Sequence, residues 1–176
     1  MILVYGAAGS GKSEAAENII VSLAKKWNLP LVYMATMENT SEAAKERIKR
    51  HRKLREGKGF FTIEEMKKPS NHLSEVKDKC VLVECMSNLV ANIFFSDEKE
   101  EIKNVKEDVR KLLREAKEVV IVTNNIFEEG KSSDEMCDEY MKALAKINME
   151  LADEAECVLE ICRGEEIFLK GDKCWT

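Results

Sequence analysis

The sequence predicts one α/β domain over residues 1–176, in which a mainly parallel sheet has helices on both faces and ends in a C-terminal strand pair. Three observations predict this architecture. Short apolar runs alternate with longer segments of helical spacing, which is typical of parallel sheets buried on both faces. A glycine-rich loop joins the first apolar run to the first helical segment. The length of 176 residues suits a single core.

The expected strands are short, apolar and bounded by turn residues. Four main strands are expected at residues 1–5, 31–36, 80–84 and 119–123, with a short piece at 60–63 and a terminal pair at 156–161 and 166–169. The expected helices cover residues 12–27, about 41–55, about 88–95, about 97–117 and about 133–153. Asn28 and Pro30 should end the first helix, one of residues 39–41 should cap the second, and Gly57 and Gly59 should end it.

Composition places the chain among ordinary globular proteins, because 44% of its residues are apolar and 35% are charged. A net charge of −5 argues against a general nucleic-acid binder. No apolar run approaches the roughly 18 residues of a membrane-spanning helix. No basic segment precedes the first strand, so no signal peptide is expected. Six cysteines without a C-x-x-C pair are expected to stay reduced, as in a cytoplasmic protein.

The glycine-rich loop has the spacing G-x-x-x-x-G-K-S between a strand and a helix, which is the context of a P-loop. It consists of Gly6, Ala7, Ala8, Gly9, Ser10, Gly11, Lys12 and Ser13. Its glycines let successive backbone N–H groups point inward, and the helix N-terminus adds partial positive charge. Lys12 can reach the β- and γ-phosphates, and the Ser13 hydroxyl can bind Mg²⁺. We therefore expect a nucleoside triphosphate site rather than a turn that only links strand to helix.

A second informative stretch is the basic segment at residues 45–55. On a helix, Arg47, His51 and Arg55 stand four residues apart and share one face. Nearby positive charge favours a neutral, nucleophilic imidazole, and arginines can stabilise the oxygens of a phosphate that it attacks. The segment therefore meets the needs of a phosphoramidate-forming histidine. A solvated basic face, or a patch that docks on a polyanion such as RNA or DNA, is an alternative interpretation.

Several blocks, in order along nearly the whole chain, resemble the bifunctional adenosylcobinamide kinase/adenosylcobinamide-phosphate guanylyltransferase family of cobalamin biosynthesis. They are residues 1–4 with Gly6 and residues 10–13, Tyr33-x-Ala35-Thr36, Arg47-Ile48-x-x-His51-Arg52-x-x-Arg55, Leu82-Val83-Glu84-Cys85 with Asn92, and Val122-Thr123-Asn124. The resemblance implies two activities. The enzyme phosphorylates a hydroxyl of adenosylcobinamide and then transfers GMP from GTP to that phosphate through a guanylylated histidine.

By this resemblance, His51 occupies the position of the guanylylated histidine. Lys12 would act in the kinase step, and Ser13 and Glu84 would hold Mg²⁺. The remaining nucleotide-binding residues implied by the P-loop and the resemblance are Arg47, Arg52, Arg55, Glu64 and Glu84. GTP and ATP would be the nucleotide substrates and a corrinoid the acceptor, in a cytoplasmic homo-oligomer that the family's habit suggests is a trimer.

The chain also departs from the family pattern. Gly9 stands where an arginine usually precedes Ser-Gly-Lys, and residues 124–130 lack the usual glycine-rich run. Of the expected Arg-Asp pair, glycine and Asn-Gln in the final helix, only Asn148 is kept. The loss of the glycine-rich run leaves open a P-loop kinase or NTPase that acts on another small molecule. The charge run at residues 45–55 leaves open a nucleotide-dependent binding module whose basic helix docks on a polyanion.

Overall fold

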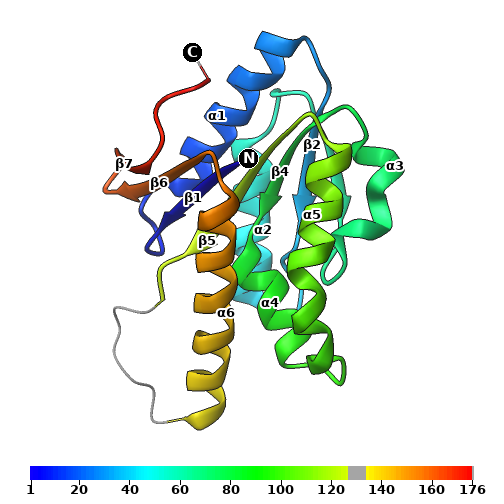
Figure 1. Cartoon of the computed structure of the whole chain (residues 1–176), viewed down its shortest axis with the longest axis vertical. Helices are drawn as coiled ribbons and strands as arrows, with labels where there is room; N and C mark the ends of the chain where they lie inside the picture. The colour runs from blue at the N-terminus through cyan, green and yellow to red at the C-terminus, as the bar shows by residue number, and fades with distance from the viewer. Residues whose placement is uncertain (127–133, 176) are drawn as a thin grey trace.

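The computed structural model describes residues 1–126 and 134–175, which form a seven-stranded sheet with helices on both faces (Figure 1). The strand order is β3-β2-β4-β5-β1-β6-β7. Each neighbouring pair is parallel except β6 and β7, which are antiparallel. The strands are β1 (Ile2–Gly6), β2 (Leu31–Ala35), β3 (Phe60–Glu64), β4 (Cys80–Glu84), β5 (Glu118–Asn124), β6 (Cys157–Cys162) and β7 (Glu165–Lys170). The predicted α/β architecture and C-terminal strand pair are confirmed.

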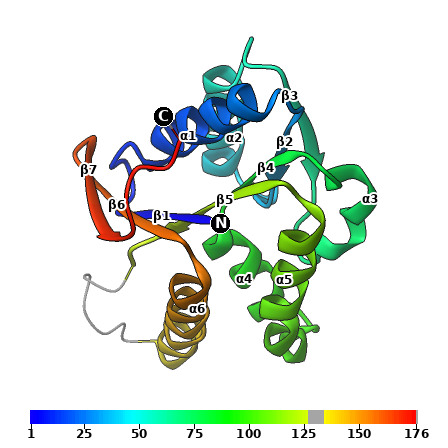
Figure 2. The ribbon, with the colours of Figure 1, turned by 45° about the horizontal axis from the view of Figure 1, so that its top comes forward.

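The α-helices cover the two faces of this sheet unequally. They are α1 (Lys12–Trp27), α2 (Glu42–Leu54), α3 (Leu73–Val76), α4 (Met86–Phe94), α5 (Val105–Glu115) and α6 (Glu135–Glu154). Helices α1 and α2 lie on one side of the sheet and α4, α5 and α6 on the other (Figure 2). Two apolar cores result. Ile19, Ile20 and Leu23 of α1 fill one, and the buried faces of α4, α5 and α6 fill the other.

The largest local difference from the sequence-based expectation lies at residues 97–117. One helix was expected there, but the segment divides into a 3₁₀ turn, η2 (Lys99–Asn104), and the α-helix α5. The η2 turn buries none of its residues. An α-helix gains most of its stability from packing an apolar face, so this mainly charged stretch has little to hold it in α form. A second 3₁₀ turn, η1 (Pro69–His72), precedes α3 in a region for which no element was expected.

Strand register brings the ends of several strands to one edge of the sheet. Gly6 of β1 pairs with Asn124 of β5, and Ala35 of β2 lies between Glu64 of β3 and Glu84 of β4. In a parallel sheet the loops that follow these ends form the ligand-binding edge. No helix in residues 1–126 or 134–175 has the length and apolar character needed to cross a membrane.

Candidate active site

The loop between β1 and α1 has the backbone geometry that its glycines predict. A Cβ on Gly6 would lie 2.6 Å from the carbonyl oxygen of Ile161, so a side chain has no room there. Gly11 has φ +96° and begins helix α1, in a conformation that glycine adopts without strain. The turn of the β6–β7 hairpin supports the loop, because the Gly164 N–H donates to the Ser10 carbonyl at 2.9 Å. The terminal strand pair therefore helps to shape the P-loop.

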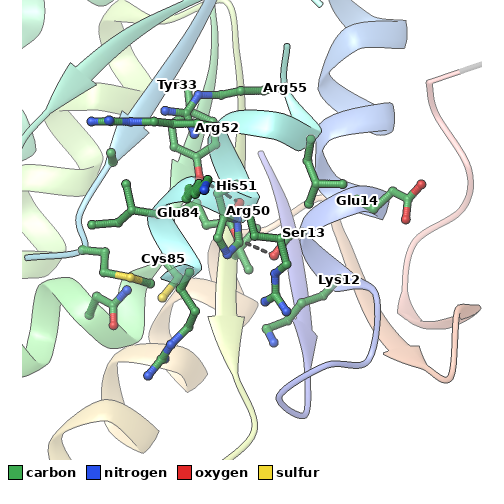
Figure 3. A pocket seen from close by; sticks show the side chains of 18 of the residues that line it. Lys12, Ser13, Glu14, Tyr33, Arg50, His51, Arg52, Arg55, Glu84 and Cys85 are labelled. Atoms are coloured by element: carbon green, nitrogen blue, oxygen red, sulfur yellow. Dashed lines mark hydrogen bonds and ion pairs between the residues drawn. The ribbon is translucent and has the colours of Figure 1, made fainter. Parts of the chain in front are cut away.

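A cleft of about 760 Å³ opens beside this loop, and helix α2 forms its opposite wall (Figure 3). The predicted site residues that line it are Ala8, Gly9, Gly11, Lys12, Ser13, Arg47, His51, Arg52, Arg55, Glu64 and Glu84. Gly6, Ala7 and Ser10 complete the loop behind that surface. Lys12 Nζ donates to the Ala7 carbonyl at 2.9 Å, so its ammonium group is held close to the loop.

Glu84, at the end of β4, is the residue on which this cleft converges. Its Oε1 accepts a short hydrogen bond from the Ser13 hydroxyl, and its Oε2 accepts one from the Tyr33 hydroxyl at 3.3 Å. His51 Nδ1 lies 3.4 Å from Oε1. Burial raises the pKa of Glu84, and the hydrogen bonds from Ser13 and Tyr33 and the charge of Lys12 oppose that rise. One carboxylate thus links the P-loop, β2 and helix α2.

His51 points into the cleft from α2 and is only 9% exposed. Burial lowers its pKa, and the positive charges of Arg50 and Arg55 lower it further, while the negative charge of Glu17 opposes them. The imidazole is therefore held in its neutral form over more of the pH range than an exposed histidine. Its Nδ1 makes no hydrogen bond within the described residues. Lys12 is buried too, and burial lowers its pKa.

The arginines of α2 have different surroundings, although the helical spacing had grouped Arg47, His51 and Arg55. The Arg55 guanidinium lies over the Tyr33 ring, 4.1 Å from its centroid. Arg52 forms an ion pair with Glu64 at 3.1 Å. Arg47 is exposed at the rim of the cleft. All three line the cleft, and the predicted Glu64 is placed there together with Arg52.

Sequence reasoning missed an ion pair between α1 and the turn that follows α2. Glu17 of α1 is fully buried, and its Oε2 lies 2.7 Å from Lys58 Nζ in the turn between α2 and β3. Burial raises the pKa of Glu17, and the Lys58 ammonium opposes this. The contact attaches the end of α2 to the P-loop helix. A signal was present, because Glu17 falls on the same helical stripe as the apolar residues Ile20 and Leu23.

The oxygen atoms of Ser13 and Glu84 fit the ligand preference of Mg²⁺. Mg²⁺ takes oxygen ligands and keeps several waters, so one hydroxyl and one carboxylate in contact are a suitable pair. Within residues 1–126 and 134–175, no cluster of three or more His, Cys, Asp and Glu side chains is arranged to hold a metal ion.

The strand–loop–helix and the cleft above it place the chain in the P-loop NTPase class. Solved structures share the fold at low identity. The structure of an ATPase domain matches with a TM-score of 0.57 and 12% identity, over 97% of this chain and 76% of that one. A KaiC-like protein from the hyperthermophilic archaeon Pyrococcus horikoshii OT3 matches with a TM-score of 0.52 and 16% identity, over 98% of this chain and 79% of that one.

The family follows from a separate comparison. The model of the cobinamide kinase / cobinamide phosphate guanyltransferase family (CobU) matches residues 2–169, nearly the whole chain. The chain therefore belongs to this family, as its sequence blocks predicted. A search of curated proteins returned no significant match. Family membership indicates a nucleotide-using enzyme of cobalamin biosynthesis with kinase and nucleotidyltransferase activities.

Proposed function

We propose that this protein phosphorylates adenosylcobinamide and transfers GMP to the product through a guanylylated His51. The observation that carries the proposal is the convergence on Glu84. The same carboxylate that accepts a hydrogen bond from the P-loop Ser13 lies 3.4 Å from His51 Nδ1. A nucleotide whose phosphates occupy the P-loop would therefore lie within the cleft that His51 lines.

The transfer takes place in two displacements at the α-phosphorus of GTP. Nδ1 of His51 faces Glu84, so Nε2 uses its lone pair to attack the α-phosphorus. The bond to the bridging oxygen breaks, and its electron pair leaves with pyrophosphate. The Glu84 carboxylate stabilises the positive charge that the ring acquires. A phosphate oxygen of adenosylcobinamide-phosphate then attacks the same phosphorus, and the electron pair of the P–N bond returns to His51.

Mg²⁺ would be held by Ser13 and Glu84 together with phosphate oxygens. When bound, it neutralises charge on the transferring group and orients the phosphates for in-line attack. Glu84 would serve both the metal and His51, because a carboxylate has two oxygens that can accept from different partners.

In the kinase step, Lys12 would steady the γ-phosphoryl group of ATP or GTP while a corrinoid hydroxyl attacks it. Lys12 Nζ is within reach of the loop carbonyls and lines the cleft beside Ser13. Its function is electrostatic, since phosphoryl transfer depends mainly on positioning and on charge neutralisation.

Incubation with Mg²⁺ and GTP labelled at the α-phosphate tests the transfer. Wild type should acquire acid-labile, alkali-stable label, and His51→Ala should acquire none although it still binds GTP. Label that persists in His51→Ala would contradict the assignment. In the kinase arm, Lys12→Ala should lose phosphorylation of adenosylcobinamide, and unchanged turnover would exclude Lys12 from that step.

The loss of the glycine-rich run at residues 124–130 of the sequence favours one second candidate, a P-loop kinase or NTPase for another small molecule. Adenosylcobinamide should raise the melting temperature of the protein if the corrinoid assignment is right. If it changes neither melting temperature nor nucleotide turnover, while GTP does bind, the second candidate is preferred.

A further inference from the structure

Arg50 precedes His51 on helix α2, and the site described so far gives it no role beyond lowering the pKa of His51. Its side chain is exposed and lines the same cleft as Lys12 and His51 (Figure 3). Within residues 1–126 and 134–175 it forms no hydrogen bond and no ion pair through its guanidinium group. A guanidinium that lines a cleft without a carboxylate partner is available to an anion that enters.

Two nearby arginines, Arg52 and Arg55, already have partners, whereas Arg47 lines the cleft and, like Arg50, makes no ion pair within residues 1–126 and 134–175. Arg52 forms its ion pair with Glu64, and Arg55 lies over the Tyr33 ring. Each would have to give up that contact in order to reach a phosphate near the P-loop. Arg50 has no such contact within the described residues, so it can bind a phosphate without breaking a hydrogen bond or an ion pair of the protein.

Arg50 also acts electrostatically on both groups between which a triphosphate would lie. Its positive charge contributes to the lowered pKa of His51 and to the lowered pKa of Lys12. Several cationic groups therefore line the same cleft. The negative charge of Glu84 opposes the lowering of the Lys12 pKa that they and burial cause. On the loop side, Gly9 has no side chain, and a Cβ there would meet no atom within 4 Å. Arg50 and Gly9 both line the cleft, so the loop leaves space for a ligand in the cleft that Arg50 also lines.

We propose that Arg50 is a further catalytic residue, which binds phosphate oxygens of the nucleoside triphosphate between Lys12 and His51. This proposal rests on the function proposed above. As His51 attacks, the bond from the α-phosphorus to the bridging oxygen breaks and negative charge develops on pyrophosphate. The Arg50 guanidinium donates hydrogen bonds to these oxygens and stabilises that charge, in the role that the helical spacing had assigned to Arg47 and Arg55.

The test compares Arg50→Ala and Arg50→Lys with the matched control Lys53→Ala. Lys53 is an exposed cation on the same helix and lies outside the cleft-lining set. Binding of a non-hydrolysable GTP analogue and of GMP is measured by calorimetry with Mg²⁺, and the rate of His51 labelling is measured at saturating GTP. Arg50→Ala should weaken binding of the analogue about tenfold, weaken GMP binding less, and slow labelling about 100-fold.

Arg50→Lys should recover part of both losses, because it keeps the charge without the forked geometry. Lys53→Ala should match wild type. The proposal is overturned if Arg50→Ala matches Lys53→Ala in both affinity and labelling rate. If wild type binds the analogue but acquires no label, the histidine step fails, and the contrast in affinity between Arg50→Ala and Lys53→Ala still decides whether Arg50 binds the triphosphate.

Discussion

Helices α2 and α5 are both rich in charged residues, but their charges are arranged differently. On α5, the cations are paired with carboxylates. Arg110 donates to Glu154 of α6 at 2.9 Å through Nε, Lys106 lies 3.5 Å from the same carboxylate, and Arg114 pairs with Glu107 at 2.8 Å. The two contacts with Glu154 join α5 to α6 on the face of the sheet opposite α1, and the Arg114–Glu107 pair lies within α5 (Figure 2).

On α2, by contrast, the cations beside His51 face a cleft. Arg47, Lys49 and Arg50 line it and make no ion pair within residues 1–126 and 134–175. The difference teaches how a run of charges is to be interpreted. The net charge of a helix does not show whether its surface is structural or binds a ligand. The two kinds of surface are distinguished by whether a neighbouring element supplies carboxylates that pair with the cations.

The sharpest test of this contrast is Glu84→Gln, which removes the carboxylate that the α2 wall of the cleft faces. Labelling of His51 should fall about 100-fold or more, because both the metal and the histidine lose their anionic partner. The melting temperature without nucleotide should rise. Burial raises the pKa of Glu84, so its charged form is disfavoured in the folded protein and a neutral amide relieves that cost. A lowered melting temperature would contradict this account of the site.

His51→Gln should have an intermediate effect, on how the free energy of unfolding depends on pH in the absence of nucleotide and metal. Burial lowers the pKa of His51 below its ordinary value of 6.5, so the unfolded chain binds more protons as the pH falls through that value. The free energy of unfolding should therefore fall toward acid pH, and it should fall less in His51→Gln. Urea unfolding at several pH values measures this. Equal acid dependence in the two proteins would show that His51 is not held neutral by the fold.

The smallest effect is expected on α5. Arg110→Ala removes an exposed ion pair with Glu154, so the melting temperature should drop slightly, and more so at low ionic strength. Labelling of His51 should stay within about twofold of wild type, as for a surface substitution away from the site. If labelling falls as far as in Arg50→Ala, the functional distinction between the two helices is wrong.

Features that depend on residues close together in the chain were predictable. The P-loop is one contiguous stretch, so its geometry follows from the glycine positions, and the flanking strand and helix end within a residue of their predicted bounds. The alternation of apolar runs with helical segments predicted the parallel sheet for the same reason. Part of the helix expected at residues 133–153 is confirmed as α6, although residues 127–133 lie outside the described part of the chain.

Which residues meet across the cleft was decided by the tertiary structure. Ser13 and Glu84 are 71 residues apart, and Glu17 and Lys58 are 41 apart, so no local pattern pairs them. Spacing on α2 could not distinguish Arg50 from Arg52 and Arg55 either, because Glu64 and Tyr33, the partners of the latter two, come from β3 and β2. The sequence by itself determined the P-loop and the fold class, because each depends on residues close together in the chain. Only packing of the strands and α2 around one cleft decided that Glu84 faces His51 and which arginines of α2 meet a partner, because those partners come from other elements.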